Sequence, residues 1–226
     1  MGNVQAVEMR CSGQVACFTR PELKAERVSY SVMTPSAARG VLEAVLWKPA
    51  IRWHIDRIRV LSPIRWIAFR RNEVASRAST PAAAVIDKGG LAPVLIVEDD
   101  RAQRNTVALR DVDYVIEAHF ELTKKAGPED NVRKFAEMFE RRLEKGQHFH
   151  QPYMGCREFV AEVGRVGDDA PSPIDHSQDL GLMLWDIEFA PGRNRPRFFR
   201  ARLKNGVMEV PVNPEATLQE RKSVTA

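Results

Sequence analysis

Apolar and polar residues alternate along several stretches of the chain, and such alternation predicts β-strands. The most regular stretch runs from Val112 to Phe120. Within 51–60 the alternation changes parity near Asp56, which indicates a β-bulge. Asn205-Gly206 favours the positive φ angles of a two-residue hairpin between its flanking stretches. In full, the pattern predicts strands over 4–10 and 15–18 (as one strand or a short hairpin), 51–60, 64–68, 94–97, 112–120, 156–163, 180–189, 197–203 and 207–212.

Two other stretches have the spacing of apolar residues that is typical of a helix. Thr34 is a good N-cap and Pro35 suits a first turn, so a helix is predicted over 35–46. A second helix is predicted over 129–145, with Gly146 in the position that follows a helix C-terminus. The polar residues that start it are Glu129, Asp130 and Asn131, and its apolar stripe comprises Phe135, Met138, Phe139 and Leu143.

In chain order, the elements of the first 163 residues read β-α-β-β-(loop)-β-α-β, which is a split β-α-β order with extra strand material. This order predicts an α+β fold whose N-terminal domain, residues 1–163, is ferredoxin-like (RRM-like). An inserted loop rich in Ala, Ser, Gly and Pro is expected over about 75–93. Residues 164–212 are expected to form a small C-terminal antiparallel β-sheet, and 213–226 a flexible tail. Because such sheets support many functions, the fold alone does not identify one.

The composition is that of an ordinary globular protein, with 226 residues, 44% of them apolar and 28% charged. No apolar run approaches the roughly 18–20 residues of a membrane helix, and the N-terminus does not have the pattern of a secretory signal. The three cysteines, Cys11, Cys17 and Cys156, form no C-x-x-C pair. We therefore expect neither a disulfide framework nor a zinc site, and we expect a reducing, cytoplasmic location.

The positive charge is concentrated in two segments that are rich in arginine. The segment 48–71 has seven cations and one acid, and 193–204 has six cations and no acid. Arginine binds phosphate in a bidentate manner, and interleaved aromatic residues such as Trp53 and Trp66 can stack on unpaired bases. The pattern favours nucleic-acid binding about as strongly as a solvated basic surface above core aromatics. Non-specific binding of double-stranded DNA is a further alternative.

No motif for a nucleotide hydrolase, a zinc protease or a serine hydrolase is present, because the chain has no Walker loop, no H-E-x-x-H and no G-x-S-x-G. Four longer strings are more specific. They are FTRPELKAERVSYSVMTPSAARGVLEAVLWKPAIRW (18–53), PIRW…RRNEV (63–74), RAQRN…LRDVDYVIEAHFEL (101–122) and QPYMGCREF (151–159). In this order they resemble the subtype I-C branch of the Cas-five family of CRISPR-associated proteins, over about 18–203.

The resemblance implies a fold and an activity. It implies a ferredoxin-like N-terminal domain, a small C-terminal β-sheet and cleavage of precursor CRISPR RNA within each repeat. The ribose 2′-OH attacks the neighbouring phosphate, so the cut needs no metal or other cofactor, but it needs a base, a cation and an acid. The protein is then expected to keep the 5′ handle of its product and to join the other subunits of the surveillance complex. The alternative is an RNA-binding subunit that has lost cleavage.

Three family positions are associated with cleavage, and only one of them has a suitable residue here. A Tyr or His precedes the W-K-P motif in the family, but Leu46 occupies that position here. A Lys-His pair opens the second helix in the family, and here it reads Lys134-Phe135. Neither Leu nor Phe can transfer a proton. Lys134 therefore stays a catalytic candidate, for neutralising the charge on phosphorus, and Phe135 fits the apolar stripe of the helix.

Other residues must then transfer the protons. His148 and His150 follow the second helix in a loop that is expected near the RNA, and imidazoles titrate near neutral pH. Their alternative role is that of exposed loop residues. Tyr30 is a weaker candidate, because the ordinary pKa of a phenol is near 10. The candidates for RNA binding are Lys48, Arg70, Arg71, Asn72, Arg101, Arg104, Arg200 and Arg202, with Lys204 on the same predicted strand face as the last two.

Overall fold

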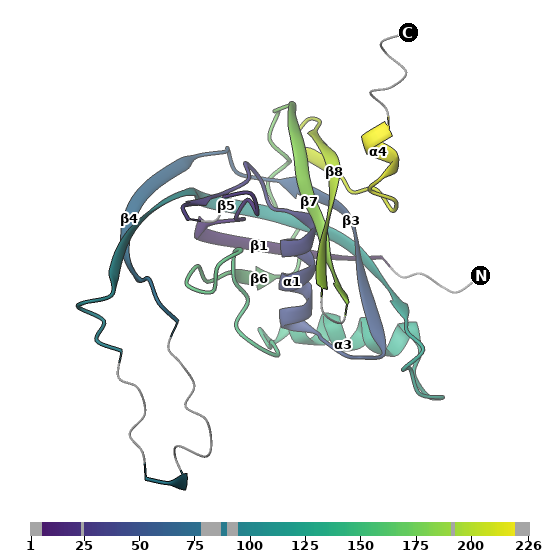
Figure 1. The fold of residues 1–226 in the computed structure, drawn as a ribbon. Helices are drawn as coiled ribbons and strands as arrows, with labels where there is room; N and C mark the ends of the chain where they lie inside the picture. The colour runs from purple at the N-terminus through teal and green to yellow at the C-terminus, as the bar shows by residue number, and fades with distance from the viewer. Residues whose placement is uncertain (1–5, 24, 78–86, 90–94, 191–192, 220–226) are drawn as a thin grey trace.

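A seven-stranded sheet forms the centre of the computed structural model, which describes residues 6–23, 25–77, 87–89, 95–190 and 193–219 (Figure 1). The strand order is β6-β1-β5-β3-β9, and β2 and β4 also pair with β5. A second sheet contains β7 and β8. In chain order the elements are β1 (Ala6–Ala16), β2 (Arg27–Val28), α1 (Pro35–Val45), β3 (Ile51–Val60), β4 (Trp66–Val74), β5 (Arg101–Leu122), α3 (Val132–Glu144), β6 (Glu162–Gly164), β7 (Gln178–Ala190), β8 (Arg193–Leu203), β9 (Val207–Glu209) and α4 (Ala216–Gln219).

Each long helix connects two strands that are not neighbours in the sheet. Helix α1 connects β1 to β3, and β5 lies between these two strands. Helix α3 connects β5 to β6, and β1 lies between those. The β1–β5, β1–β6 and β3–β5 pairings are all antiparallel. Two split β-α-β units therefore interleave in one antiparallel sheet.

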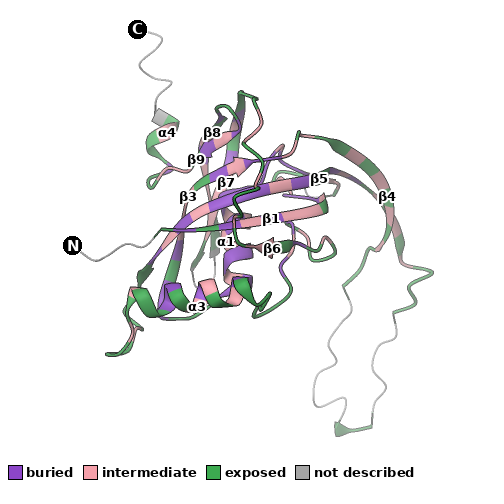
Figure 2. Ribbon diagram, turned by 180° about the vertical axis from the view of Figure 1, so that it is seen from behind, coloured by how far each residue is buried: buried purple, intermediate pink, exposed green. Residues whose placement is uncertain are grey.

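The hydrophobic core lies between one face of this sheet and the helices. Trp53 of β3 contacts the rings of Phe120 in β5 and Phe139 in α3, with centroids 5.0 and 5.1 Å away. The opposite sheet face carries ion pairs such as Arg10–Asp113, at 2.7 Å. Figure 2, seen from behind, shows β1 and β5 in front of α1. The buried residues of the helices are Pro35, Ala38, Val41, Leu42, Ala44 and Val45 in α1 and Phe135, Ala136, Phe139 and Leu143 in α3.

Strand β5 is 22 residues long and serves two parts of the molecule. Its second half pairs with β1 and β3 in the sheet, and its first half pairs with β4 along 66–74 and, at Thr106 and Val107, also with the short β2. The β4–β5 pair extends away from the body of the protein and curves as a long arm (Figure 1). Asp111 has a positive φ of +52°, yet the register with β1 is the same on both sides of it, and the buried residues keep one parity, from Thr106 and Ala108 to Val112 and Tyr114.

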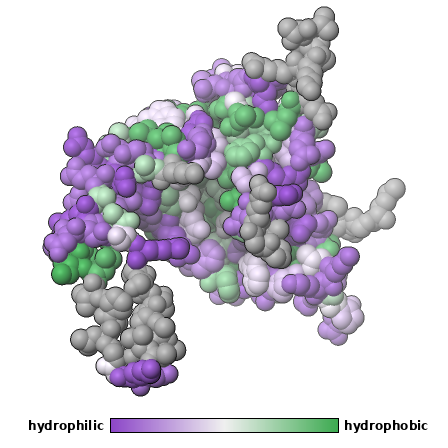
Figure 3. Space-filling model, in the orientation of Figure 1, coloured by the Kyte–Doolittle hydropathy of each residue, from purple (hydrophilic) through white to green (hydrophobic). Residues whose placement is uncertain are grey.

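The β7–β8 sheet packs on α1 and closes the core. Arg39 of α1 forms an ion pair with Asp186 of β7 at 2.7 Å, and Met183 of β7 and Phe199 of β8 are buried in the same core as the large sheet. After the turn at 205–206, β9 returns to pair with β3. Figure 3 shows that apolar side chains also gather on the outer surface around β7 and β8, where Leu182 and Phe189 are exposed.

Several local predictions are confirmed. The Thr34 side chain accepts a hydrogen bond from Ala37 N at 3.2 Å as the N-cap of α1, and Asn131 caps α3. Gly146 follows α3 with φ of +62°. The pairing of β3 shifts between Ile55 and Arg57, as the change of parity predicted. Asn205 and Gly206 both have positive φ, with Lys204 bridged to Val207. Of the two alternatives predicted for the N-terminal segment, the single strand is confirmed over 6–16, because Gly13 pairs within the ladder opposite Val112.

Other predictions are wrong. The strand predicted over 156–163 is mostly turn, because the backbone at Gly155 has a φ of +82° and only 162–164 pair with β1. Residues 95–97 do not form a strand, and Val94 and much of the loop predicted over 75–93 lie outside the described residues.

Candidate nucleic-acid interface

The segment between α1 and β3 lies against α3, and its backbone is fixed by side chains. Arg142 of α3 donates a hydrogen bond to the carbonyl oxygen of Val45 at 2.5 Å. The indole Nε1 of Trp53 donates one to the carbonyl oxygen of Leu46 at 3.0 Å. The last carbonyls of a helix have no partner within the helix, so these two donors end α1 and hold the segment in place.

The N-terminal end of α3 has an ion pair with a further lysine in its neighbourhood. Lys134 Nζ is 2.9 Å from Asp130 Oδ1. The pKa of Asp130 is lowered, first by the backbone N–H of Gly127 and then by Lys134, with a smaller contribution from Lys48. Asp130 thus forms an ion pair with Lys134, and Lys48 lies near enough to favour its charged form, so two cations face one carboxylate. The helix N-terminus adds to this positive potential, which suits a phosphate group.

The two family positions without a proton-transferring residue lie in the core. Leu46 is fully buried, and Phe135 is 3% exposed. Phe135 packs edge-on against Phe120 with centroids 6.5 Å apart. Both side chains therefore face the sheet, whereas Lys134, the residue between Arg133 and Phe135, faces solvent with 45% of its side chain exposed.

The loop after α3 places both candidate histidines in solvent. His150 lies between two aromatic rings, with centroids 5.9 Å from Phe149 and 6.4 Å from Tyr153. Its Nδ1 lies 3.3 Å from the carbonyl oxygen of Gln151, and its backbone N–H bonds to Ala44 at 3.3 Å. His150 is thus held near the end of α1, and no hydrogen bond or ion pair is found for the His148 side chain within the described residues.

Tyr30 is placed differently from the other catalytic candidates. It is 1% exposed, and the guanidinium carbon of Arg20 lies 4.5 Å from the centre of its ring. Burial raises its pKa above the ordinary value for tyrosine. A buried phenol with a raised pKa is a poor general base, so we leave Tyr30 out of the proposed machinery.

The arm brings five of the predicted binding residues together. Arg71 lies directly opposite Arg104, and on this face of the arm Arg71 forms ion pairs with Glu73 and Glu158. The other face is exposed and basic. Its side chains are those of Arg70, Asn72, Arg101, Trp66, Gln103 and Asn105. Among the paired residues 66–74 and 101–109, no carboxylate lies on this face.

The arginines of β8 have the predicted parity. Arg200 and Arg202 alternate with the buried residues Phe199 and Ala201. Arg200 pairs with Asp179 of β7, and this pairing lowers the pKa of Asp179. Asp179 of β7 thus neutralises part of this basic surface.

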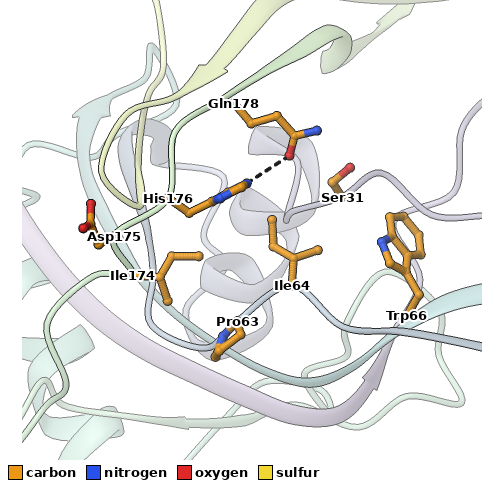
Figure 4. A pocket seen from close by; sticks show the side chains of 8 residues that line it. All are labelled: Ser31, Pro63, Ile64, Trp66, Ile174, Asp175, His176 and Gln178. Atoms are coloured by element: carbon orange, nitrogen blue, oxygen red, sulfur yellow. Dashed lines mark hydrogen bonds between the residues drawn. The ribbon is translucent and has the colours of Figure 1, made fainter.

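A hollow of about 620 Å³ lies at the base of the arm (Figure 4). Trp66 stands at one side of it, and Ser31 and Ile64 line it next to Trp66. His176 and Gln178 line the hollow on the side away from Trp66, and His176 Nε2 lies 3.3 Å from the Gln178 side-chain oxygen. An exposed indole beside polar side chains is a surface on which a nucleobase can stack.

The sequence pattern gives no indication of a thiol pair beside the arm. The pKa of Cys156 is lowered, first by a hydrogen bond with Cys17 and then by Thr19 and Arg27, whereas the pKa of Cys17 is raised. Arg27 Nη1 lies 3.8 Å from Cys156 Sγ. The two cysteines are 139 residues apart in the chain, so only the tertiary structure brings them together.

Among the described residues, no group of three or more His, Cys, Asp or Glu side chains has an arrangement that could hold a metal ion. No helix in the same part of the chain is long and apolar enough to span a membrane.

The chain is similar to curated proteins along almost its whole length. It is 50% identical over 213 residues to a protein of Mannheimia succiniciproducens named "CRISPR pre-crRNA endoribonuclease Cas5d", with 91% of this chain and 94% of that protein covered. A protein of the same name from Thermus thermophilus is 41% identical over 223 residues, with 91% of each chain covered.

Solved structures have the same fold. A crystal structure titled "Crystal Structure of CRISPR-associated Protein" matches with a TM-score of 0.68 at 22% identity, over 94% of both chains. A chain of a "CRISPR RNA-guided surveillance complex" matches with a TM-score of 0.50 at 15% identity, over 96% of this chain and 97% of that one. The family model for CRISPR-associated Cas5d proteins matches residues 6–211. With this match and the two close relatives, the chain belongs to the Cas5d family of CRISPR-associated proteins.

Proposed function

We propose that this protein is an endoribonuclease that cleaves precursor CRISPR RNA within its repeats. The observation that carries the proposal is 50% identity, over nearly the full length, to a relative named for that activity. The basic end of α3 supports it, because Lys134 occupies the family's lysine position and faces solvent beside Lys48.

The proposed chemistry uses Lys134 in the first turn of α3 and the two histidines of the loop that follows the helix. The 2′-oxygen of a ribose attacks the adjacent phosphorus, the bond to the 5′-oxygen breaks, and the product carries a 2′,3′-cyclic phosphate. Lys134 would neutralise the extra negative charge that develops on the phosphoryl oxygens. His150 and His148 would remove the proton from the 2′-oxygen and return one to the leaving 5′-oxygen. A single lysine cannot readily act as both the base and the acid, so the two proton transfers are assigned to other residues.

A second candidate function is supported by the burial of Leu46 and Phe135. With neither side chain able to move a proton or to reach solvent, the protein would bind the RNA and keep its 5′ handle without cutting it. The basic face of the arm, with Arg70, Asn72 and Arg101, would contact RNA in both cases. Arg71 and Arg104 lie on the face with the carboxylates, so we give them a supporting role.

We further propose a ferredoxin-like core and a place in a larger complex. The two interleaved split β-α-β units support the first proposal. The residues after 164 are proposed to be a C-terminal β region that completes this core, since Met183 and Phe199 are buried in it. The similarity in fold to a chain of a surveillance complex supports the second proposal. The free thiols of Cys11, Cys17 and Cys156 favour a reducing cytoplasm.

The test is cleavage of end-labelled repeat RNA by the purified protein in the presence of a chelator. We expect a single cut that leaves a cyclic phosphate, and we expect a 2′-deoxy sugar on the 5′ side of the cut to abolish it. Tight repeat binding without cleavage would establish the non-cutting alternative. Equal affinity for repeat RNA and random double-stranded DNA, with a steep loss of both in salt, would contradict both RNA proposals.

A further inference from the structure

A row of aromatic side chains, exposed except for a half-buried tyrosine at its far end, crosses the surface at the C-terminal end of α1. Trp47 is 50% exposed and Phe149 is 63% exposed. Their ring centroids are 6.2 Å apart with planes inclined by 31°. The row continues from Phe149 to His150 at 5.9 Å and from His150 to Tyr153 at 6.4 Å, where the rings are stacked. Large aromatic side chains with this much surface in water indicate a site of interaction.

The backbone holds this row in position. The N–H groups of Phe149 and His150 both donate to the carbonyl oxygen of Ala44, at 2.7 and 3.3 Å. Tyr153 is bridged to Val160 on the far side of the loop. Trp47 follows Leu46, whose carbonyl is bonded to the indole of Trp53. The four rings are therefore placed by two segments about 100 residues apart, before any ligand binds.

Charge next to the row identifies the kind of partner. Lys48 is adjacent to Trp47, and together with Lys134 it makes the surface at that end positive. Flat aromatic faces with cations at one end are complementary to unpaired bases on a phosphate backbone. A protein partner with an apolar surface would complement the rings but would gain nothing from the two lysines.

We propose that Trp47, Phe149, His150 and Tyr153 form a stacking platform for unpaired bases of the repeat RNA next to the scissile phosphate. This inference rests on the proposed function and adds how the substrate is aligned. A base on Trp47 places its phosphate beside Lys48 and Lys134. Successive bases on Phe149 and His150 lead the strand across the end of α1, so single-stranded RNA is the form bound.

The test measures the affinity of the full-length protein for repeat RNA with one 2′-deoxy sugar at the cleavage position, so that nothing is cut. We expect Phe149→Ala to weaken binding by about 5- to 150-fold, the range that the loss of one base–aromatic stack produces. Phe189→Ala is the matched control, because Phe189 on β7 is 70% exposed and lies in another part of the fold. Phe149→Trp should restore the affinity, since the indole keeps a stacking face.

A second measurement uses the unaltered protein with RNAs that have one abasic nucleotide each. We expect one or two positions to reproduce the loss seen with Phe149→Ala, and the two changes to be non-additive in a double-mutant cycle. Equal affinities of Phe149→Ala, Phe189→Ala and the parent protein would overturn the platform. So would normal RNA binding by Phe149→Ala combined with failure to assemble with other complex subunits. If the parent protein itself does not bind repeat RNA, the proposed function fails as well.

Discussion

Lys134 has two roles that a pair of substitutions can separate. The first turns of α3 contain two ion pairs with i, i+4 spacing, Asp130–Lys134 at 2.9 Å and Arg133–Glu137 at 2.7 Å. If Lys134 only stabilises the helix, Lys134→Ala and Arg133→Ala should have the same effect. If it neutralises charge in the transition state, only Lys134→Ala should affect cleavage.

The expected magnitudes are far apart. Exposed ion pairs contribute little to stability, so both variants should melt within about 2 °C of the parent protein. Removing one group that stabilises developing charge costs about 100-fold or more in rate, so Lys134→Ala should be slower by at least that factor. Arg133→Ala should cleave at the parent rate, because Arg133 is paired with Glu137 and has 85% of its side chain in solvent.

The assay is single-turnover cleavage of repeat RNA at saturating protein, so that a change in binding does not alter the rate. Circular dichroism melts of the same samples report stability. A Lys134→Ala rate within about threefold of the parent rate would refute the transition-state role, since one lost charge interaction of this kind produces a much larger effect. Equal losses in both variants would show that the helix, and not the ammonium group, matters for cleavage.

Three further predictions concern other parts of the molecule. Arg70→Ala should weaken RNA binding and make the dependence of the affinity on salt less steep. Arg71→Ala should mainly lower the melting temperature, because it removes the ion pair with Glu158. The rate of labelling by iodoacetamide should rise with pH with a midpoint well below that of an ordinary thiol, because hydrogen bonding and a nearby guanidinium lower the pKa of Cys156. Cys156→Ser should remove this reaction, and a midpoint near pH 8.5 would contradict the prediction. Gly155→Ala should prevent normal folding, because the new Cβ would collide with a backbone carbonyl. Gly146→Ala has open space around it, so it should lower the free energy of unfolding by only about 1–2 kcal/mol because of the positive φ. Similar urea midpoints for the two variants would refute this difference.

The sequence predicts the core of the fold better than the arm, and the reason is physical. Strands such as 51–60 and 112–120 have one buried face, so their residues alternate. The first half of β5, from Arg101 to Asn105, pairs only with β4 and covers no core, so both of its faces are polar and no alternation marks it.

The candidate site shows a similar limit. The sequence string identifies Lys134 as a candidate, and the structure places it on an exposed helix turn, but its catalytic role stays a prediction. The contact between Trp47 and Phe149 joins residues about 100 positions apart, and no periodicity within either segment can reveal it. Tyr30 lies in a family-like string, but the string does not show that its phenol is buried.

The order of the strands also has a consequence for how the chain folds during synthesis. β1 has no partner until β5 has been made, since Arg10 pairs with Asp113, and its outer edge stays open until β6 at 162–164 emerges. Sheets built from such distant segments form slowly, because the chain loses the entropy of closing long loops before the stabilising strand contacts form. The β1 strand is therefore an unpaired, half-apolar edge for most of translation. A nascent chain stalled before residue 101 should be recognised by chaperones, and one stalled after residue 164 should already resist proteolysis in its first sheet.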